Sequence, residues 1–215
     1  ALCRLIDFHQ PRRSLIFCNT KKMVDEMTQE LKGRGYEAEG LHGDLSQFQR
    51  DTVMNLFRSG RCAILIATDV AARGIDVSGV DAVFNYDVPE DIEYYVHRIG
   101  RTGRAGREGK SMTLVSGREV FKIRDIERIC HTRIEEKKLP TGKDIVKVKF
   151  QHSVDSALEA AKDQNLEGLK NRIESVCDEM GISELDLAAA LLYQSMGEEP
   201  QEIEEERFYY DRNRR

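Results

Sequence analysis

The chain has 215 residues, enough for one large domain or for a domain of about 140 residues with an appendage. Its formal net charge of −5 provides no overall attraction for nucleic acid, so a site for an anionic ligand has to be local. The five cysteines are scattered and contain no CxxC pair, which argues against a zinc site or a disulfide framework and favours reduced thiols in a cytoplasmic protein.

The sequence contains no apolar run near the roughly 18 residues that a membrane span requires, and no signal peptide opens it. We therefore expect no membrane association. Its first residues have the pattern of the middle of a helix, which indicates a piece of a longer protein.

Short apolar runs alternate with helical patterns over the first two thirds of the chain. The runs predict strands at 14–19, 36–43, 63–67, 82–86 and 111–115, the first of which suits a strand buried on both faces. The patterns between them predict helices, one of which starts at a capping box of Ser46 and Gln49, and a further helix at 120–134. This alternation favours an α/β fold with a parallel sheet covered by helices on both faces.

Polar residues follow four of the predicted strands. They are Asn19 and Thr20, His42 to Asp44, Thr68 and Asp69, and Asp87. In open α/β sheets, ligands bind beyond the carboxyl ends of the strands. The sequence therefore predicts a binding site along this edge.

The pattern changes near residues 139–142, and beyond residue 149 it predicts three helices, near 153–164, 166–180 and 183–196. The last helix is apolar over more than one face, and three short helices cannot bury that surface alone. A partner is expected to cover it, although the same side chains could instead pack on the preceding domain. The candidate interface residues are Leu185, Leu187, Ala188, Leu191, Leu192 and Met196.

An arginine- and glycine-rich run, His-Arg-Ile-Gly-Arg-Thr-Gly-Arg, occupies residues 97–104. Arginine offers a fork of donors that matches phosphate oxygens, and glycine allows a ligand to approach the backbone closely. Taken alone, such a run favours a solvated basic loop over an anion site. Three earlier stretches decide between these: Ser-Leu-Ile-Phe-Cys-Asn-Thr at 14–20, Gln-Phe-Gln-Arg at 47–50 and Ala-Thr-Asp-Val-Ala-Ala-Arg-Gly-Ile-Asp at 67–76.

With these stretches, residues 1–140 resemble the second RecA-like domain of a DEAD-box RNA helicase, matching motifs IV, V and VI and the QxxR element. The resemblance implies an ATP site completed by the first RecA-like domain, and a path for RNA. By the family pattern, Arg101 and Arg104 would be arginine fingers, and Asp76 would bind the ATP ribose or, alternatively, cap its loop. The chain has no GxxxxGK[ST] phosphate loop and no Asp-Glu-Ala-Asp sequence, so ATP with Mg²⁺ would depend on metal ligands of the absent domain.

The remaining motif residues receive RNA-binding or structural roles from the same resemblance. The RNA path would include Thr20, Gly43, Gln47, Arg50, Thr68 and Gly74, and the interdomain or structural residues would be Phe17, Arg73, His97 and Arg98. Thr20 and Gln47 could instead cap their helices. Arg98 could form a structural ion pair or contact phosphate directly. His97 could relay between the two ligand sites or hold the local structure.

Residues 141–200 resemble the homodimerising extension of bacterial cold-shock and heat-resistant DEAD-box helicases, followed by a charged tail at 201–215. We expect the C-terminal half of a cytoplasmic ATP-dependent RNA helicase that is inactive as an ATPase alone. Family analogy suggests ribosome biogenesis or a stress response. The alternatives are a non-catalytic dimeric RNA-binding or scaffold module and a DNA-directed superfamily 2 translocase.

Overall fold

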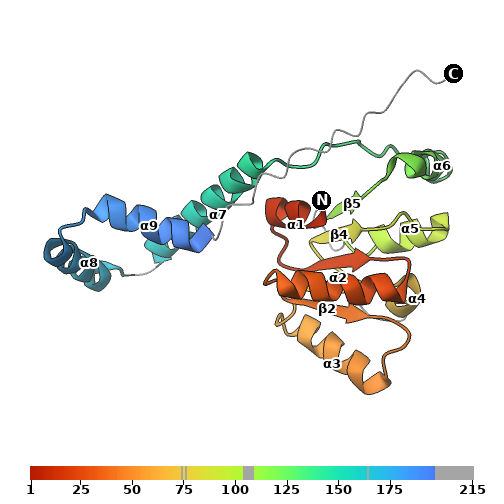
Figure 1. Cartoon of the computed structure of the whole chain (residues 1–215), viewed down its shortest axis with the longest axis horizontal. Helices are drawn as coiled ribbons and strands as arrows, with labels where there is room; N and C mark the ends of the chain where they lie inside the picture. The colour runs from red at the N-terminus through yellow and green to blue at the C-terminus, as the bar shows by residue number, and fades with distance from the viewer. Residues whose placement is uncertain (74, 76, 104–108, 164, 197–215) are drawn as a thin grey trace. The chain divides into compact units, whose positions relative to one another are not determined.

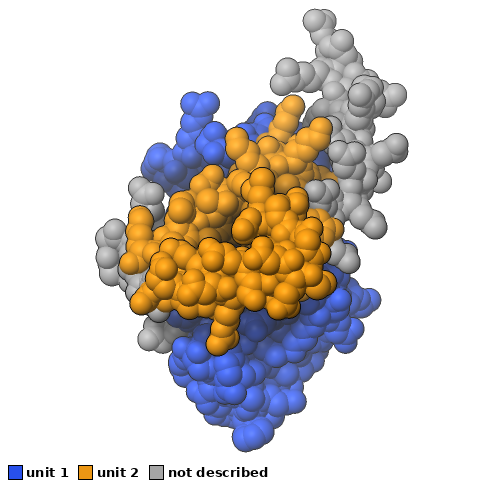
Figure 2. All heavy atoms as spheres, turned by 90° about the vertical axis from the view of Figure 1, so that its left-hand side faces the viewer, with its two compact units in different colours: residues 1–3, 10–137, 210–215 blue, residues 4–9, 138–209 orange. Residues whose placement is uncertain are grey.

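A computed structural model describes residues 1–73, 75, 77–103, 109–163 and 165–196. Internal contacts divide these residues into two compact units, which Figure 2 colours separately. Unit 1 holds residues 1–3 and 10–137, and unit 2 holds residues 4–9 together with the described residues from 138 onward. The change of unit after residue 137 lies near the predicted boundary at 140. Residues 4–9, however, group with the helical unit and not with the α/β unit.

Unit 1 is built on a five-stranded parallel sheet, which confirms the predicted fold class (Figure 1). Its strands are β1 (Ser14–Phe17), β2 (Ala38–Leu41), β3 (Ile64–Ala67), β4 (Ala82–Asn85) and β5 (Lys110–Thr113), in the order β2-β3-β1-β4-β5. All residues of β1, β3 and β4 are buried, which explains their continuous apolar runs. Phe17 pairs with both Ala67 and Asn85, so the carboxyl ends of these strands are level.

Five helices of unit 1 flank the sheet: α2 (Lys21–Gly33), α3 (Gln47–Arg58), α4 (Asp69–Ala72), α5 (Ile92–Ile99) and α6 (Val120–Cys130). Helices α2 and α3 cover opposite faces of the sheet. Met54 and Phe57 of α3 pack in one cluster with Leu15 and Leu65. On the other face, α2 approaches β2 so closely that a Cβ on Gly40 would lie 2.7 Å from Thr28 Oγ1. The capping box before α3 is present as predicted, with Ser46 Oγ accepting a hydrogen bond from the Gln49 amide.

Unit 2 is helical, with α7 (Gly142–Asp163), α8 (Glu167–Met180), α9 (Glu184–Met196) and most of α1 (Leu2–His9). Helix α9 packs against α7 and α8. The predicted start of α7 near residue 153 was wrong, because Asp144 N–H donates to Thr141 Oγ1 and begins the helix at Gly142. The sequence did not predict this helical stretch, because the β-branched residues that follow Asp144 favour strands.

Helix α6 ends at Cys130, earlier than the predicted residue 134. His131 adopts a left-handed conformation with φ 49°, which terminates the helix. Across the described ranges, no helix is both long and apolar enough to cross a membrane.

Candidate functional site

The polar residues that follow β1, β2, β3 and β4 lie along the carboxyl edge of the sheet, as the sequence predicts. Strands β2 and β3 end directly before His42 and Thr68, and one residue separates the ends of β1 and β4 from Asn19 and Asp87. Strands β2 and β3 are in register at Leu41 and Ala67, so the turns that follow them leave the sheet at the same level.

Arg98, in the last turn of α5, is fully buried and ties three of these strand ends together. Its Nε and Nη2 atoms donate to the two carboxylate oxygens of Asp69, each at 2.6 Å. Its Nη1 donates to the Asp87 carbonyl oxygen and its Nη2 to Asn19 Oδ1, both at 2.8 Å. The guanidinium also lies 5.0 Å from the centroid of the Phe17 ring. Because all three of its nitrogens are used internally, the structure supports the ion-pair alternative for Arg98.

The partners of Arg98 are also bonded to one another. The Asn19 amide donates to Asp87 Oδ2 at 2.8 Å, and the Asn19 side-chain amide donates to the Val88 carbonyl at 3.0 Å. The sequence identified Asn19, Asp69 and Asp87 as polar residues at strand ends but not their common partner. No local spacing connects residues that are up to 79 positions apart in the chain.

Arg101 lies in the turn after α5 and lines a small cavity of about 170 Å³. Its Nη1 donates to the Ile75 carbonyl at 3.2 Å and its Nη2 to the Ala72 carbonyl at 3.4 Å. These are long hydrogen bonds to neutral acceptors, which an anion would outcompete. The cavity is lined by Phe17, Asp69, Ala72, Arg73, Tyr94, His97, Arg98 and Arg101.

The other motif residues of this region differ in exposure. His97 is exposed and lines the cavity, and Phe17 is buried beneath the Arg98 guanidinium. The Arg73 guanidinium lies 4.9 Å from the centroid of the Tyr94 ring. Arg104, Asp76 and Gly74 lie outside the described residues.

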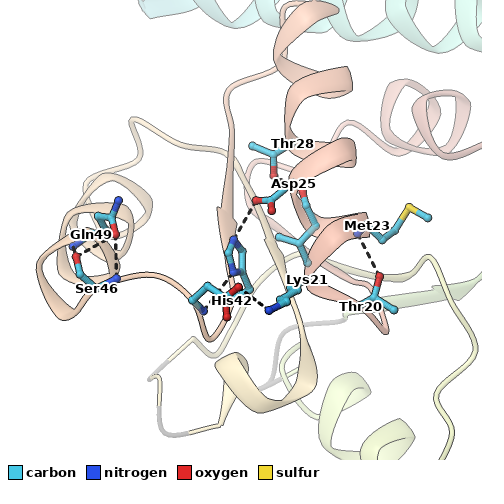
Figure 3. Close-up of polar contacts among 10 residues, drawn as sticks. Thr20, Lys21, Met23, Asp25, Thr28, His42, Ser46 and Gln49 are labelled. Atoms are coloured by element: carbon cyan, nitrogen blue, oxygen red, sulfur yellow. Dashed lines mark hydrogen bonds and ion pairs between the residues drawn. The ribbon is translucent and has the colours of Figure 1, made fainter.

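A second cluster joins the start of α2 to the turn after β2 (Figure 3). The Thr20 hydroxyl accepts a hydrogen bond from Met23 N–H at 3.2 Å and so caps α2, which was one of its two predicted roles. His42 is buried, and its Nε2 lies 2.9 Å from Asp25 Oδ1. Lys21 Nζ lies 2.6 Å from Asp44 Oδ2. This hydrogen bond raises the pKa of Lys21 and lowers that of Asp44, so both groups stay charged.

The QxxR element lies on the first turn of α3. Gln47 does not cap the helix, because its side-chain amide donates to Asp51 Oδ1 at 2.9 Å. Arg50 Nη2 donates to the Ala71 carbonyl of α4 at 3.2 Å. The Thr68 hydroxyl accepts from the Ala71 amide at 3.4 Å and caps α4. Helices α3 and α4 are therefore held together through the backbone of Ala71.

Two observations limit the chemistry of the site. Desolvation raises the pKa of the buried Cys18 thiol to about 12, with the Asp87 charge acting in the same direction, so this thiol is not a nucleophile. Within the part of the chain that the structure describes, no three His, Cys, Asp or Glu side chains are grouped to hold a metal ion.

The candidate interface residues of α9 remain largely uncovered within unit 2. Leu185 is 78% exposed and Leu191 is 53% exposed. Ala188 is also exposed, Leu187, Leu192 and Met196 are half-buried, and α9 has no fully buried residue.

Comparison with known proteins agrees with this architecture. Residues 1–106 match the model of the helicase conserved C-terminal domain, and residues 140–206 match the RNA helicase DeaD dimerization domain. The DEAD-box ATP-dependent RNA helicase CshA of Geobacillus kaustophilus is 42% identical over 178 residues, which cover 83% of this chain and 38% of that protein. The chain therefore spans well under half the length of this relative.

Solved structures show the same similarity. Escherichia coli DEAD-box protein SrmB bound to regulator of ribonuclease activity A matches with a TM-score of 0.58 and 33% identity, over 65% of this chain and 88% of that chain. Saccharomyces cerevisiae Dbp5 bound to RNA and ADP BeF3 matches with a TM-score of 0.55 and 40% identity, over 59% of this chain and 34% of that chain.

The parallel sheet, with its arginine-bearing turn at the carboxyl edge, defines a C-terminal RecA-like helicase domain. The match to the DeaD dimerization model adds the helical extension. The chain belongs to the DEAD-box RNA helicases, as the sequence motifs predict.

Proposed function

We propose that the chain is the C-terminal half of an ATP-dependent RNA helicase that remodels short RNA duplexes. The observation that supports this best is the contrast between two neighbouring arginines. Arg98 uses all three of its side-chain nitrogens inside the domain, whereas Arg101, among the described residues, donates to two backbone carbonyls and lines a cavity. A phosphate delivered to this edge would therefore meet a cation that is free to exchange partners.

In this proposal Arg101 and Arg104 stabilise the charge that develops on the transferred phosphoryl group. Asp76 binds the ATP ribose, and Arg73 and His97 contribute to the interdomain surface. The first RecA-like domain of the same protein supplies the phosphate cradle and the Mg²⁺ ligands. ATP and RNA would then shift the population of the two domains toward a closed arrangement.

The proposed RNA path follows the same edge of the sheet. Gly43 is exposed, and nothing lies within 4 Å of the position that a Cβ would occupy, so a sugar-phosphate backbone can approach its main chain. Gln47, Arg50 and Thr68 surround the α3–α4 contact described above, and Thr20 and Gly74 extend the path. These groups are suited to sugar and phosphate and not to base edges.

The test of the proposed function compares this chain with the full-length protein. We expect the chain alone to hydrolyse no ATP, whereas the full-length protein shows ATPase activity that RNA stimulates and DNA of the same sequence does not. Robust ATP hydrolysis by the chain alone would contradict the proposal that the active site is divided between two domains. Stimulation by DNA would favour the translocase alternative. RNA binding with no ATPase in the full-length protein would favour the scaffold alternative.

We further propose that unit 2 forms a homodimer through α9. The exposed Leu185 and Leu191 lie on one helix with the half-buried Leu187 and Leu192, and together they form an apolar surface of a kind that monomers rarely leave open. The same surface repeats in a second copy, as a two-fold interface requires.

Leu191→Asp is expected to weaken dimerisation by a factor on the order of 100, because each interface would bury two unpaired carboxylates. Sedimentation of the chain over a concentration series measures this effect. Ala190→Asp is the matched control, since Ala190 is exposed on the same helix but outside the candidate set. A wild-type monomer at all concentrations would contradict the dimer.

A further inference from the structure

Lys21 pairs with Asp44 in the turn that contains Gly43, yet no motif assigns it a role (Figure 3). It follows Thr20 directly as the first residue of α2, and Asp44, its partner, follows Gly43 directly. The Nζ–Oδ2 distance of 2.6 Å therefore places its ammonium group beside the turn that we propose as an RNA contact.

The turn is held on α2 by a second contact that fixes this geometry. The buried His42 ring bonds to Asp25 through Nε2, and its Nδ1 accepts from the Asp44 amide at 3.4 Å. Because Asp25 lies one helical turn after Lys21, the same stretch of α2 positions both the turn and the lysine. The His42 contacts therefore keep the Gly43 turn next to the start of α2, where Lys21 lies.

We propose that Lys21 binds an RNA phosphate at the Gly43 turn, and that Asp44 holds its ammonium group there until the phosphate replaces the carboxylate. This inference rests on the proposed RNA path. The Lys21 and Asp44 side chains are 61% and 59% exposed, so water screens their attraction and the pair is readily exchanged. A phosphate gains the same ammonium donors, and its condensed counterions are released to solution.

Asp44 also opposes the phosphate through its own negative charge. In the free chain it neutralises Lys21, and in the complex it would lie close to the incoming anion. Removing this charge while keeping the side-chain shape, by Asp44→Asn, should therefore strengthen RNA binding. This increase in RNA affinity should be smaller when Lys21 is also replaced by Ala.

Fluorescence anisotropy with a labelled single-stranded oligouridylate, in KCl from about 50 to 200 mM, tests the proposal on this chain. Lys21→Ala should weaken binding about fivefold at the lowest salt and reduce the slope of log affinity against log salt by about 0.7. Asp44→Asn should tighten binding about fivefold, and the double variant should lose most of that gain.

Lys22→Ala is the matched control, because Lys22 is the next residue on the same helix turn and pairs at 3.6 Å with Glu26 of its own helix. Lys22→Ala removes one positive charge, as Lys21→Ala does. If Lys21→Ala and Lys22→Ala weaken binding to the same extent, Lys21 acts only as diffuse charge and the proposal is overturned.

Arg50→Ala separates this failure from failure of the RNA path itself. If Arg50→Ala weakens RNA binding and Lys21→Ala does not, Lys21 is excluded as an RNA contact and the proposed RNA path still holds. Absence of RNA binding by the wild-type chain, or equal binding by the wild type and Arg50→Ala, would contradict the path on which the inference rests.

Discussion

Arg101→Ala in the full-length protein is expected to lower kcat for RNA-stimulated ATP hydrolysis by about a thousandfold, while KM for ATP changes far less. The guanidinium would be needed most where charge develops on the transferred phosphoryl group, so its removal destabilises the transition state more than the bound substrate. Steady-state ATPase assays at saturating RNA measure both constants. Arg101→Lys should recover little, because a single ammonium group cannot reproduce the planar fork.

Arg128→Ala provides the control for Arg101→Ala, since Arg128 is an exposed arginine of α6 that pairs with Asp125 on its own helix. Its ATPase activity should equal that of the wild type. An Arg101→Ala protein with an unchanged kcat would rule out a finger role for this residue. Thermal unfolding of both variants should match the wild type, because the partners of Arg101 among the described residues are the backbone carbonyls of Ile75 and Ala72, reached by long hydrogen bonds.

Arg98→Met is expected to lower the free energy of unfolding of unit 1 by about 3–5 kcal/mol. The substitution keeps much of the side-chain volume but leaves the half-buried carboxylate of Asp69 and the side-chain oxygen of Asn19 without their donor. Urea unfolding of the chain, followed by circular dichroism, measures the change.

Asp69→Leu combined with Arg98→Met distinguishes an unpaired charge from lost packing. If the unpaired Asp69 carboxylate causes most of the loss, the double variant is more stable than Arg98→Met alone. A loss below about 1 kcal/mol for Arg98→Met would contradict the structural role of the Arg98–Asp69 ion pair.

The α/β unit could be predicted from the sequence because its signals are local. Apolar runs such as 63–67 and caps such as Ser46 with Gln49 specify their elements within a few residues, and the structure confirms both. The start of α7 was missed because Ile145 and Val146 are β-branched and favour strands when only propensity is considered. The capping contact between Thr141 and Asp144 outweighs that preference.

The candidate site could be placed at the correct edge of the sheet, but its internal connections could not be predicted. The bond from Arg98 to Asn19 joins two different elements, and only the folded sheet brings them within 2.8 Å. Likewise, His42 lies on the turn after β2 and Asp25 lies on α2, and only the folded structure brings them into contact. Motif patterns identify which residue types are required, whereas the tertiary structure determines which of them are used internally.

Unit 2 combines residues 4–9 with residues from 138 onward, and this affects how the molecule is assembled during synthesis. On the ribosome, residues 4–9 emerge before the sheet, but their partners emerge only after the sheet is complete. Unit 1 can therefore fold cotranslationally around its own core, whereas unit 2 has to wait for contacts of high sequence separation, which form slowly. Helix α1 is therefore synthesised before the sheet but is among the last elements of these two units to reach its final packing.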